Sequence, residues 1–337
     1  MAEIGIIGAG TWGTALGVLL HNNGHRVTMW SAFEEDAREL RERRVHKNLP
    51  GVALPDEMDF TASMEEAVSG GKPLVLAVPS IYVRTTARAM APFLKDSRLI
   101  INVSKGIEES TLMTLTQVIE EEIPGASAAV LSGPSHAEEV GKGLPTTCVA
   151  GAGERSLAQA VQSIFMSPVF RVYTSPDIMG IEVGGALKNV IALAAGIADG
   201  LGYGDNTKAA LITRGIHEIA RLGMEMGGAF ETFSGLTGIG DLIVTCASLH
   251  SRNRRAGILI GKGYSMKEAM REVNMVVEGV YSARAARLLA QKYKVSMPIV
   301  EQVNQVLFEG KSPAEAVREL MMRDRTSETE ALLWSRT

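Results

Sequence analysis

The first half of the chain alternates short β-rich runs with longer amphipathic segments, and this alternation constrains the fold more than any other feature. Runs typical of strands occur at residues 3–9, 26–30, 73–79, 98–104, 128–133, 146–151 and 170–175. Helical patterns such as TWGTALGVLLHNN and STLMTLTQVIEEEI lie between most of them. Strands that alternate with helices pair mainly in parallel. We therefore expect an α/β fold with a Rossmann-like, doubly wound, mostly parallel sheet covered by helices on both faces.

The pattern changes after residue 177, where helical periodicity rich in Ala, Leu, Met and Ile replaces the strand signals. Helices are expected at residues 178–200, 206–226, 252–262, 265–272, 279–293, 297–308 and 312–322, with turn-rich joints at 202–206 and 233–241. This predicts a sheet domain over 1–177, a C-terminal all-helical domain over 178–323 and a tail over 324–337.

Charge and composition exclude several classes of partner. The 337 residues carry a net charge of −4 with both signs mixed along the chain, so neither a nucleic-acid footprint nor a polybasic membrane patch is indicated. We expect no secretory signal and no apolar run long enough to span a bilayer. Cys148 and Cys246 lie in apolar strings, which favours buried free thiols and a cytoplasmic location. The scattered histidines predict no metal site.

A glycine motif follows the first expected strand. Gly8, Gly10 and Gly13 form G-x-G-x-x-G between an apolar strand and an Ala/Leu-rich helix. This spacing allows a tight turn, lets a pyrophosphate approach the backbone and aims a helix N-terminus at the anion. The alternative is a purely structural turn, but the strand-turn-helix context favours a dinucleotide-binding domain over 1–177.

The end of the second expected strand should distinguish NAD from NADP, through an acid for the ribose hydroxyl or an arginine for a 2′-phosphate. Ser31, Ala32 and Phe33 stand there, so neither signal is present. Glu34 and Glu35 follow directly, while the nearby arginines are typical of a solvated helix face. The residues therefore indicate weak discrimination between the two cofactors.

Polar residues follow other strands at the edge where a parallel sheet binds ligands. Lys105 in NVSKG is either a solvated loop lysine or a group that reaches a phosphate or carbonyl. Gly133 and Ser135 in LSGPS either open a helix or bind an anion through backbone amides and a hydroxyl.

Lys188 lies near the beginning of the apolar segment GGALKNVIALAAGIADGL. Its helical neighbours are small and apolar, so a desolvated amine would have a lowered pKa suited to proton transfer. On the helix pattern alone, the favoured interpretation is a lysine whose amine reaches water. Asp241 in GIGD is either a helix cap or the partner of a lysine.

A polar cluster, SLHSRNRRAG, precedes another expected helix. Ser251, Arg252 and Asn253 would combine a hydroxyl, a guanidinium and an amide with the amides of a helix N-terminus, which makes an anion site. The alternative is a solvated basic surface.

Taken together, GAGTWGTALG, AVPS, SKGIE, SGPSHAEEV, GGALKNVIALAAGIADGLGYGDNTKAALI, GLTGIGDLIVTC, SRNRRAG and VVEGVYSA occur in this order. The chain thereby resembles the bacterial-type NAD(P)-dependent sn-glycerol-3-phosphate dehydrogenases over nearly all of residues 3–320. The resemblance implies reversible reduction of dihydroxyacetone phosphate to sn-glycerol 3-phosphate for phospholipid synthesis, with NAD or NADP as cofactor. It also implies a homodimer that acts on a small-molecule phosphate substrate.

The resemblance assigns roles to individual residues. Lys188 matches the proton donor and acceptor and contacts the substrate, Lys105 matches a contact to cofactor and substrate, and Asp241 matches a substrate contact that would also orient Lys188. The remaining substrate contacts match Gly133, Ser135, Ser251, Arg252 and Asn253. The cofactor contacts match Gly8, Gly10, Thr11, Trp12, Gly13, Ala32, Phe33, Lys105, Ala137, Arg252, Val276 and Glu278. Many family members carry a basic residue where Ala32 and Phe33 stand, so we predict that NADH is used at least comparably to NADPH.

Two other functions compete with this interpretation. One is a 3-hydroxyacid or 6-phosphogluconate-type dehydrogenase, which typically needs an Asn one turn after the lysine, where this chain has Ala192. The other is a non-catalytic dinucleotide-binding sensor, which would have little reason to keep both lysines and the Ser-Arg-Asn cluster.

Overall fold

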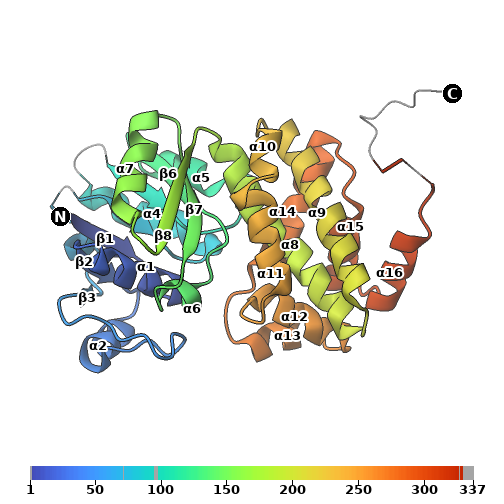
Figure 1. Cartoon of the computed structure of the whole chain (residues 1–337), viewed down its shortest axis with the longest axis horizontal. Helices are drawn as coiled ribbons and strands as arrows, with labels where there is room; N and C mark the ends of the chain where they lie inside the picture. Colours follow the sequence, from blue (N-terminus) through green and yellow to red (C-terminus); the bar gives the residue numbers. More distant parts are fainter. Residues whose placement is uncertain (1, 71, 95–97, 326, 329–337) are drawn as a thin grey trace.

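A sheet with its helices and a bundle of helices lie side by side in the protein (Figure 1), whose structure is a computed structural model. It describes residues 2–70, 72–94, 98–325 and 327–328. The expected tail over 324–337 therefore lies mostly outside the described residues.

The sheet has eight strands in the order β3-β2-β1-β4-β5-β6-β7-β8. All neighbouring strands are parallel except β6 and β7, which confirms the predicted mostly parallel sheet. Their bounds are β1 Glu3–Ile7, β2 Arg26–Trp30, β3 Asp59–Thr61, β4 Leu74–Leu76, β5 Leu99–Asn102, β6 Ser127–Ser132, β7 Thr146–Ala152 and β8 Phe170–Ser175. Sequence reasoning missed β3, because three residues give too short a signal to be recognised.

Helices cover both faces of this sheet, because successive strand residues point to opposite sides. Ile6 packs into one apolar cluster and Ile7 into the other. The first cluster is shared with α1 (Thr11–Asn22), α2 (Glu34–Arg43), α6 (Ala137–Val140) and α7 (Arg155–Phe165). The second is shared with α3 (Met64–Val68), α4 (Val83–Met90) and α5 (Leu115–Glu122). Short 3₁₀ turns at Ser80–Tyr82 and Ala91–Phe93 flank α4.

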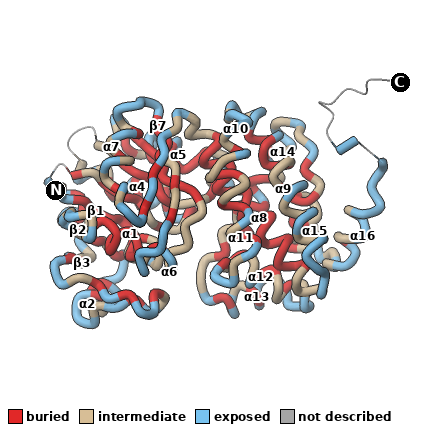
Figure 2. The backbone as a smooth tube through the Cα atoms, in the orientation of Figure 1, coloured by how far each residue is buried: buried red, intermediate tan, exposed pale blue. Residues whose placement is uncertain are grey.

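The helical part is built around α8 (Ile178–Gly200), which is buried along most of its length (Figure 2). Around it pack α9 (Asp205–Glu225), α11 (Asp241–Ala247), α12 (Arg252–Gly261), α14 (Glu278–Tyr293) and α15 (Pro298–Phe308). The remaining helices are α10 (Phe230–Phe233), α13 (Met266–Val273) and α16 (Pro313–Met321). Small residues permit the close packing: a Cβ on Gly257 would lie 2.2 Å from the Leu193 carbonyl oxygen.

The expectation that no apolar run could span a bilayer is wrong as a statement about length and composition. Helix α8 is long and apolar enough to cross a membrane, and its most apolar 18-residue window has a mean hydropathy of 1.5. The structure buries 89% of that window inside the protein, so α8 has the burial of a core helix.

The turn-rich joint predicted at 233–241 is confirmed only at 234–235. The chain then forms a π-helical turn, Leu236–Gly240, that continues directly into α11 at Asp241. A Cβ on Gly184 would lie 2.7 Å from the Thr237 carbonyl oxygen, so this turn rests against α8. Gly184 therefore permits close packing between α8 and this turn.

Candidate active site

The glycine motif shapes the turn between β1 and α1. Gly8 has φ +121°, and a Cβ on Gly13 would lie 2.0 Å from the Gly8 carbonyl oxygen, so both positions require glycine. Gly10 differs from them, because a Cβ there would meet no protein atom within 4 Å. The first and third glycines therefore hold the turn together, while the second exposes backbone to an adjoining cavity.

The beginning of α1 is suited to an anion. Gly10 precedes the helix and has no side chain to bond the first amides. The Thr11 hydroxyl is buried without a protein partner, while the Trp12 indole donates to the Val103 carbonyl oxygen at 3.2 Å. An open glycine, bare helix amides and an unpartnered hydroxyl fit the diphosphate of a dinucleotide.

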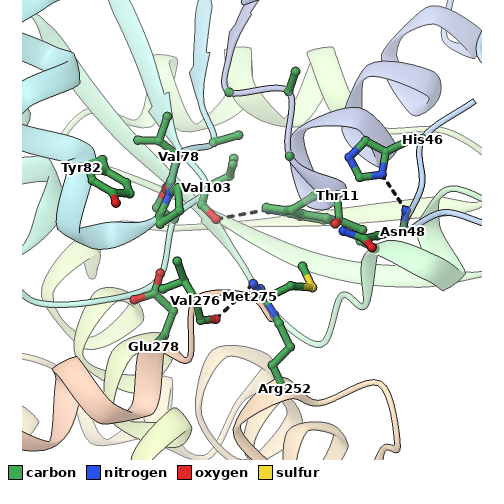
Figure 3. A pocket seen from close by; sticks show the side chains of 18 of the residues that line it. Thr11, His46, Asn48, Val78, Tyr82, Val103, Arg252, Met275, Val276 and Glu278 are labelled. Atoms are coloured by element: carbon green, nitrogen blue, oxygen red, sulfur yellow. Dashed lines mark hydrogen bonds between the residues drawn. The ribbon is translucent and has the colours of Figure 1, made fainter. Parts of the chain in front are cut away.

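The adjoining cavity has a volume of about 960 Å³ and lies between the sheet and the helical part. Figure 3 shows Val78, Tyr82 and Val103 facing Arg252 and Glu278 across it. Most of the predicted site residues line it: Gly8, Gly10, Thr11, Trp12, Ala32, Phe33, Lys105, Ser135, Ala137, Lys188, Ser251, Arg252, Asn253, Val276 and Glu278. Gly13, Gly133 and Asp241 do not line it and lie behind its wall.

Lys188 is buried at the boundary between the two parts, with 6% of its surface exposed, so the interpretation of a solvated lysine is wrong. Its Nζ donates to Asp241 Oδ1 at 2.5 Å and to the Thr245 hydroxyl at 2.7 Å. Asp241 begins α11, and Thr245 lies one turn further along the same helix. Burial lowers the pKa of the Lys188 amine to about 8, although the charge on Asp241 opposes this shift.

Lys105 reaches the same carboxylate from the sheet side. Its Nζ donates to Asp241 Oδ2 at 2.6 Å and to the Gly133 carbonyl oxygen at 2.9 Å. Burial alone would raise the pKa of Asp241, but Lys105 and Lys188 outweigh burial and hold it below its ordinary value. One buried carboxylate is therefore shared by two ammonium groups that border the cavity.

Lys188, Lys105 and Asp241 together can transfer a proton and stabilise negative charge. A lysine with a pKa near 8 exchanges its proton readily around neutral pH. The second lysine adds a fixed positive charge in a site where water is largely excluded, which strengthens its effect on a developing oxyanion.

The predicted anion cluster lies at the beginning of α12. The Ser251 hydroxyl accepts from the Arg254 amide at 3.2 Å and so caps the helix. The Asn253 side chain donates to Asn189 Oδ1 and accepts from the Gly279 amide, each at 2.8 Å. Arg252 Nη1 donates to the Val276 carbonyl oxygen at 3.2 Å. These contacts give the cavity a rigid wall that presents the Arg252 guanidinium.

A carboxylate joins the two walls of the cavity. Glu278, at the beginning of α14, accepts from the Ser80 amide at 3.0 Å and from the Ser80 hydroxyl. Burial raises the pKa of this carboxyl. Glu278 therefore holds the helical part against the loop after β4.

The end of the second strand has mixed charge. Ala32 and Phe33 are exposed at the rim of the cavity, where Asp36, Glu39 and Lys47 also line it. The arginines of α2 pair with neighbouring acids instead: Arg38 with Glu35, Arg41 with Glu34 and Arg43 with Glu39. None of these three arginines lines the cavity.

Sequence reasoning missed several residues of the site. Thr245 could have been found, because its spacing from Asp241 places both on one face of a helix. His46 and Asn48 also line the cavity, and nothing in their local sequence indicates this. His136 and His250 line it too, and each lies directly beside a predicted site residue, in the segments SGPSHAEEV and SLHSRNRRAG. Within the described ranges, no three His, Cys, Asp or Glu side chains come together as a potential metal site.

The chain is similar to known proteins over nearly its whole length. Family models described as the N-terminus and the C-terminus of NAD-dependent glycerol-3-phosphate dehydrogenase match residues 3–158 and 177–318. A glycerol-3-phosphate dehydrogenase [NAD(P)+] of Agathobacter rectalis is 62% identical over 99% of this chain and 100% of its own length. One of Fusobacterium nucleatum is 59% identical over 98% of this chain and 100% of its own length.

A solved structure is similar over the whole molecule. The crystal structure of glycerol-3-phosphate dehydrogenase from Coxiella burnetii superposes with a TM-score of 0.92 at 36% identity. The match covers 96% of this chain and 99% of that one.

Proposed function

Because the chain belongs to the NAD-dependent glycerol-3-phosphate dehydrogenase family, we propose that it interconverts dihydroxyacetone phosphate and sn-glycerol 3-phosphate with NAD(H) or NADP(H). The observation that supports the mechanism best is the pair of lysines on the buried carboxylate of Asp241, beside a cavity that begins at the glycine turn. The product would supply the backbone of glycerophospholipids.

Lys188 is the proton donor in the direction of reduction. The bound dinucleotide supplies the hydride for reduction and accepts it in the reverse direction. Lys188 Nζ donates its proton to the substrate oxygen on C2 as negative charge develops there. In the direction of oxidation, the neutral amine takes the hydroxyl proton. A pKa of about 8 makes both forms accessible near neutral pH.

Asp241 and Lys105 set the conditions for this transfer. Asp241 Oδ1 orients the Lys188 amine, and Thr245 holds the same nitrogen from a second direction. Lys105 contributes a second positive charge for the substrate oxygen. The Gly133 carbonyl oxygen fixes the Lys105 amine and also accepts from the Ser135 hydroxyl at 3.0 Å.

The substrate phosphate binds at the beginning of α12. Arg252 supplies the cation, and Ser251 and Asn253 keep the first turn of the helix rigid. A phosphate held there leaves the opposite end of a three-carbon substrate free to reach Lys188, which borders the same cavity.

The residues around the glycine turn bind the cofactor. Gly10 and the amides at the beginning of α1 would hold the diphosphate, and Trp12, Ala137, Val276 and Glu278 would complete the binding surface. We also propose that NADH is used at least comparably to NADPH, because Ala32 and Phe33 offer no cation for a 2′-phosphate and none of the α2 arginines lines the rim. Ala32→Arg should then raise kcat/KM for NADPH relative to NADH, and an unchanged ratio would count against this assignment.

Residues 1–177 then serve as the dinucleotide domain and 178–323 as the substrate domain. A homodimer in the cytoplasm agrees with the family resemblance and with the free thiols of Cys148 and Cys246, which are both buried. Sedimentation of the purified chain tests the dimer.

The direct test of the mechanism is Lys188→Ala, assayed by NADH oxidation with dihydroxyacetone phosphate. The variant should lose roughly 10²- to 10⁴-fold in kcat while it binds NADH with unchanged affinity. Lys208→Ala is the matched control, because Lys208 also pairs with a helical acid, Asp199 at 2.9 Å. Near-normal turnover by folded Lys188→Ala would refute the role. Turnover with 3-hydroxyacids instead of dihydroxyacetone phosphate would favour the rival dehydrogenase.

A further inference from the structure

A second buried carboxylate lies on α8, about two turns before Lys188. The Glu182 side chain is 5% exposed and faces the sheet domain, and sequence reasoning did not single it out. Its Oε1 accepts from Asn102 Nδ2 and from the Thr116 amide, each at 3.1 Å, and its Oε2 accepts from the Thr116 hydroxyl. Burial raises the pKa of this carboxyl, so the fold keeps Glu182 here at a desolvation cost.

Asn102 connects this carboxylate to the loop that carries Lys105. Asn102 is the last residue of β5 and is fully buried. Its Nδ2 also donates to the Ser104 carbonyl oxygen at 3.2 Å, and its Oδ1 accepts from the Ser104 amide at 3.0 Å. The amide group therefore holds both backbone polar groups of the residue that precedes Lys105.

The side chain of Lys105 then runs beside α8 to its target. A Cβ on Gly185 would lie 3.7 Å from Lys105 Cγ and 3.8 Å from Cδ. The Lys105 Nζ reaches Asp241 Oδ2 at 2.6 Å. Helix α8 thus carries Lys188, Gly185 and Glu182. Gly185 lies beside the Lys105 side chain, and Glu182 holds the loop that carries Lys105.

We propose that Glu182 is a positioning residue, which acts through Asn102 to hold Ser104 and Lys105 so that the Lys105 amine stays on Asp241. The inference rests on the roles proposed above for Lys105 and Lys188. It follows from an unbroken series of contacts: Glu182 to Asn102, Asn102 to Ser104, and Lys105 to Asp241. Without its acceptor, the Asn102 amide is no longer fixed in the orientation that holds Ser104.

Three variants test this proposal. Glu182→Met removes both acceptors at similar side-chain volume, whereas Glu182→Gln keeps one oxygen for Asn102 and the Thr116 amide. Glu218→Met is the matched control, because Glu218 is a buried carboxylate that accepts from the Ile299 and Val300 amides of α15 and not from the loop that carries Lys105. Each variant is compared with the wild type in kcat, KM, NADH affinity and melting temperature.

The positioning role predicts a specific pattern. Glu182→Met should lower kcat roughly tenfold to hundredfold with little change in NADH affinity, because small displacements of a reacting group are costly. Glu182→Gln should keep kcat within about threefold of the wild type. Glu218→Met should lose thermal stability comparably and keep kcat.

A pH profile distinguishes a loss of Lys105 positioning from a general loss of stability. If Lys105 leaves Asp241, Lys188 loses a neighbouring like charge, and its pKa should rise by roughly one unit. The alkaline limit of kcat for dihydroxyacetone phosphate reduction should therefore move to higher pH in Glu182→Met and stay unchanged in Glu218→Met. A loss of stability alone would not shift this limit.

Several outcomes would overturn the proposal. Wild-type kcat and an unshifted limit in folded Glu182→Met would do so, as would equal kcat losses in Glu182→Met and Glu218→Met. If Glu182→Met does not fold at the assay temperature, Asn102→Ala replaces it, because this variant breaks the same series of contacts. Normal kinetics in Asn102→Ala would overturn the positioning proposal. If Lys188→Ala is inactive while these variants are normal, only this inference fails. If Lys188→Ala is active, the proposed mechanism fails.

Discussion

Removing the charge of Asp241 should move the pH dependence of the enzyme to lower pH. Asp241→Asn leaves the side-chain shape nearly unchanged but removes the anion that lies 2.5 Å from Lys188 Nζ and 2.6 Å from Lys105 Nζ. That anion opposes the effect of burial on the pKa of Lys188. In its absence, burial and the like charge of Lys105 both lower this pKa without opposition.

The size of the shift follows from the geometry. An opposite charge in direct contact typically changes a pKa by about one to three units. The wild-type pKa is about 8, so half of the Lys188 amines carry the proton needed for reduction at pH 8. A pKa lowered by one to three units leaves only about 10% to 0.1% protonated at that pH. For each protein, the reduction rate at pH 8 is divided by the plateau rate of the same protein at low pH. This ratio should therefore be roughly fivefold to several hundredfold lower in Asp241→Asn than in the wild type.

The assay measures initial rates of NADH oxidation with saturating dihydroxyacetone phosphate across the pH range in which each protein remains folded. Asp199→Asn is the matched control, because Asp199 is also an acid shared by two cations, Arg254 at 2.7 Å and Lys208 at 2.9 Å. Its alkaline midpoint should equal that of the wild type. An unchanged or raised midpoint in Asp241→Asn would refute the electrostatic account of Lys188.

Three further predictions concern the glycine turn and a buried acid. Gly13→Ala should destabilise the fold by about 1–3 kcal/mol in urea unfolding, because its Cβ would lie 2.0 Å from the Gly8 carbonyl oxygen. Gly10→Ala should leave unfolding unchanged and weaken NADH binding in a fluorescence titration; equal NADH affinity would contradict the proposed diphosphate site. Glu218 has a pKa of about 7 in the fold, raised by burial from 4.5, so its stabilising contribution is complete below about pH 4.5 and is lost as pH rises through 7. The unfolding free energy of the wild type minus that of Glu218→Gln should fall by about 3 kcal/mol over this range, and a constant difference would show that Glu218 is not titrating.

Local patterns were sufficient for most of the architecture. The alternation of strands and helices, the glycine turn and most helices after residue 177 could be predicted, because each depends on neighbours close in sequence. The glycine-rich stretch at 233–241 shows where such reasoning fails. Glycines there indicate turns when only the local sequence is considered, yet residues 236–240 form a π-helical turn that packs against Gly184 on α8.

The sequence indicates some residues of the site but not the contacts between them. The motifs around Lys105, Lys188 and Asp241 stand out in the sequence, but the helix pattern around Lys188 favours a solvated amine. Its burial depends on Asp241 and Thr245, and Asp241 lies 53 residues further along the chain. The contact between Asn102 and Glu182 joins residues 80 apart, and although Asn102 begins the NVSKG segment, nothing in the sequence points to Glu182 as its partner.

The sequence by itself therefore determined the class of fold, the turn for a dinucleotide and the identity of the charged groups. Each of these follows from local backbone preferences or from the chemistry of a short motif. Only the tertiary structure decided which charges meet and how far they are removed from water. Those two quantities set the pKa of Lys188, because pKa shifts depend on distances and burial that arise when segments far apart in the chain pack together.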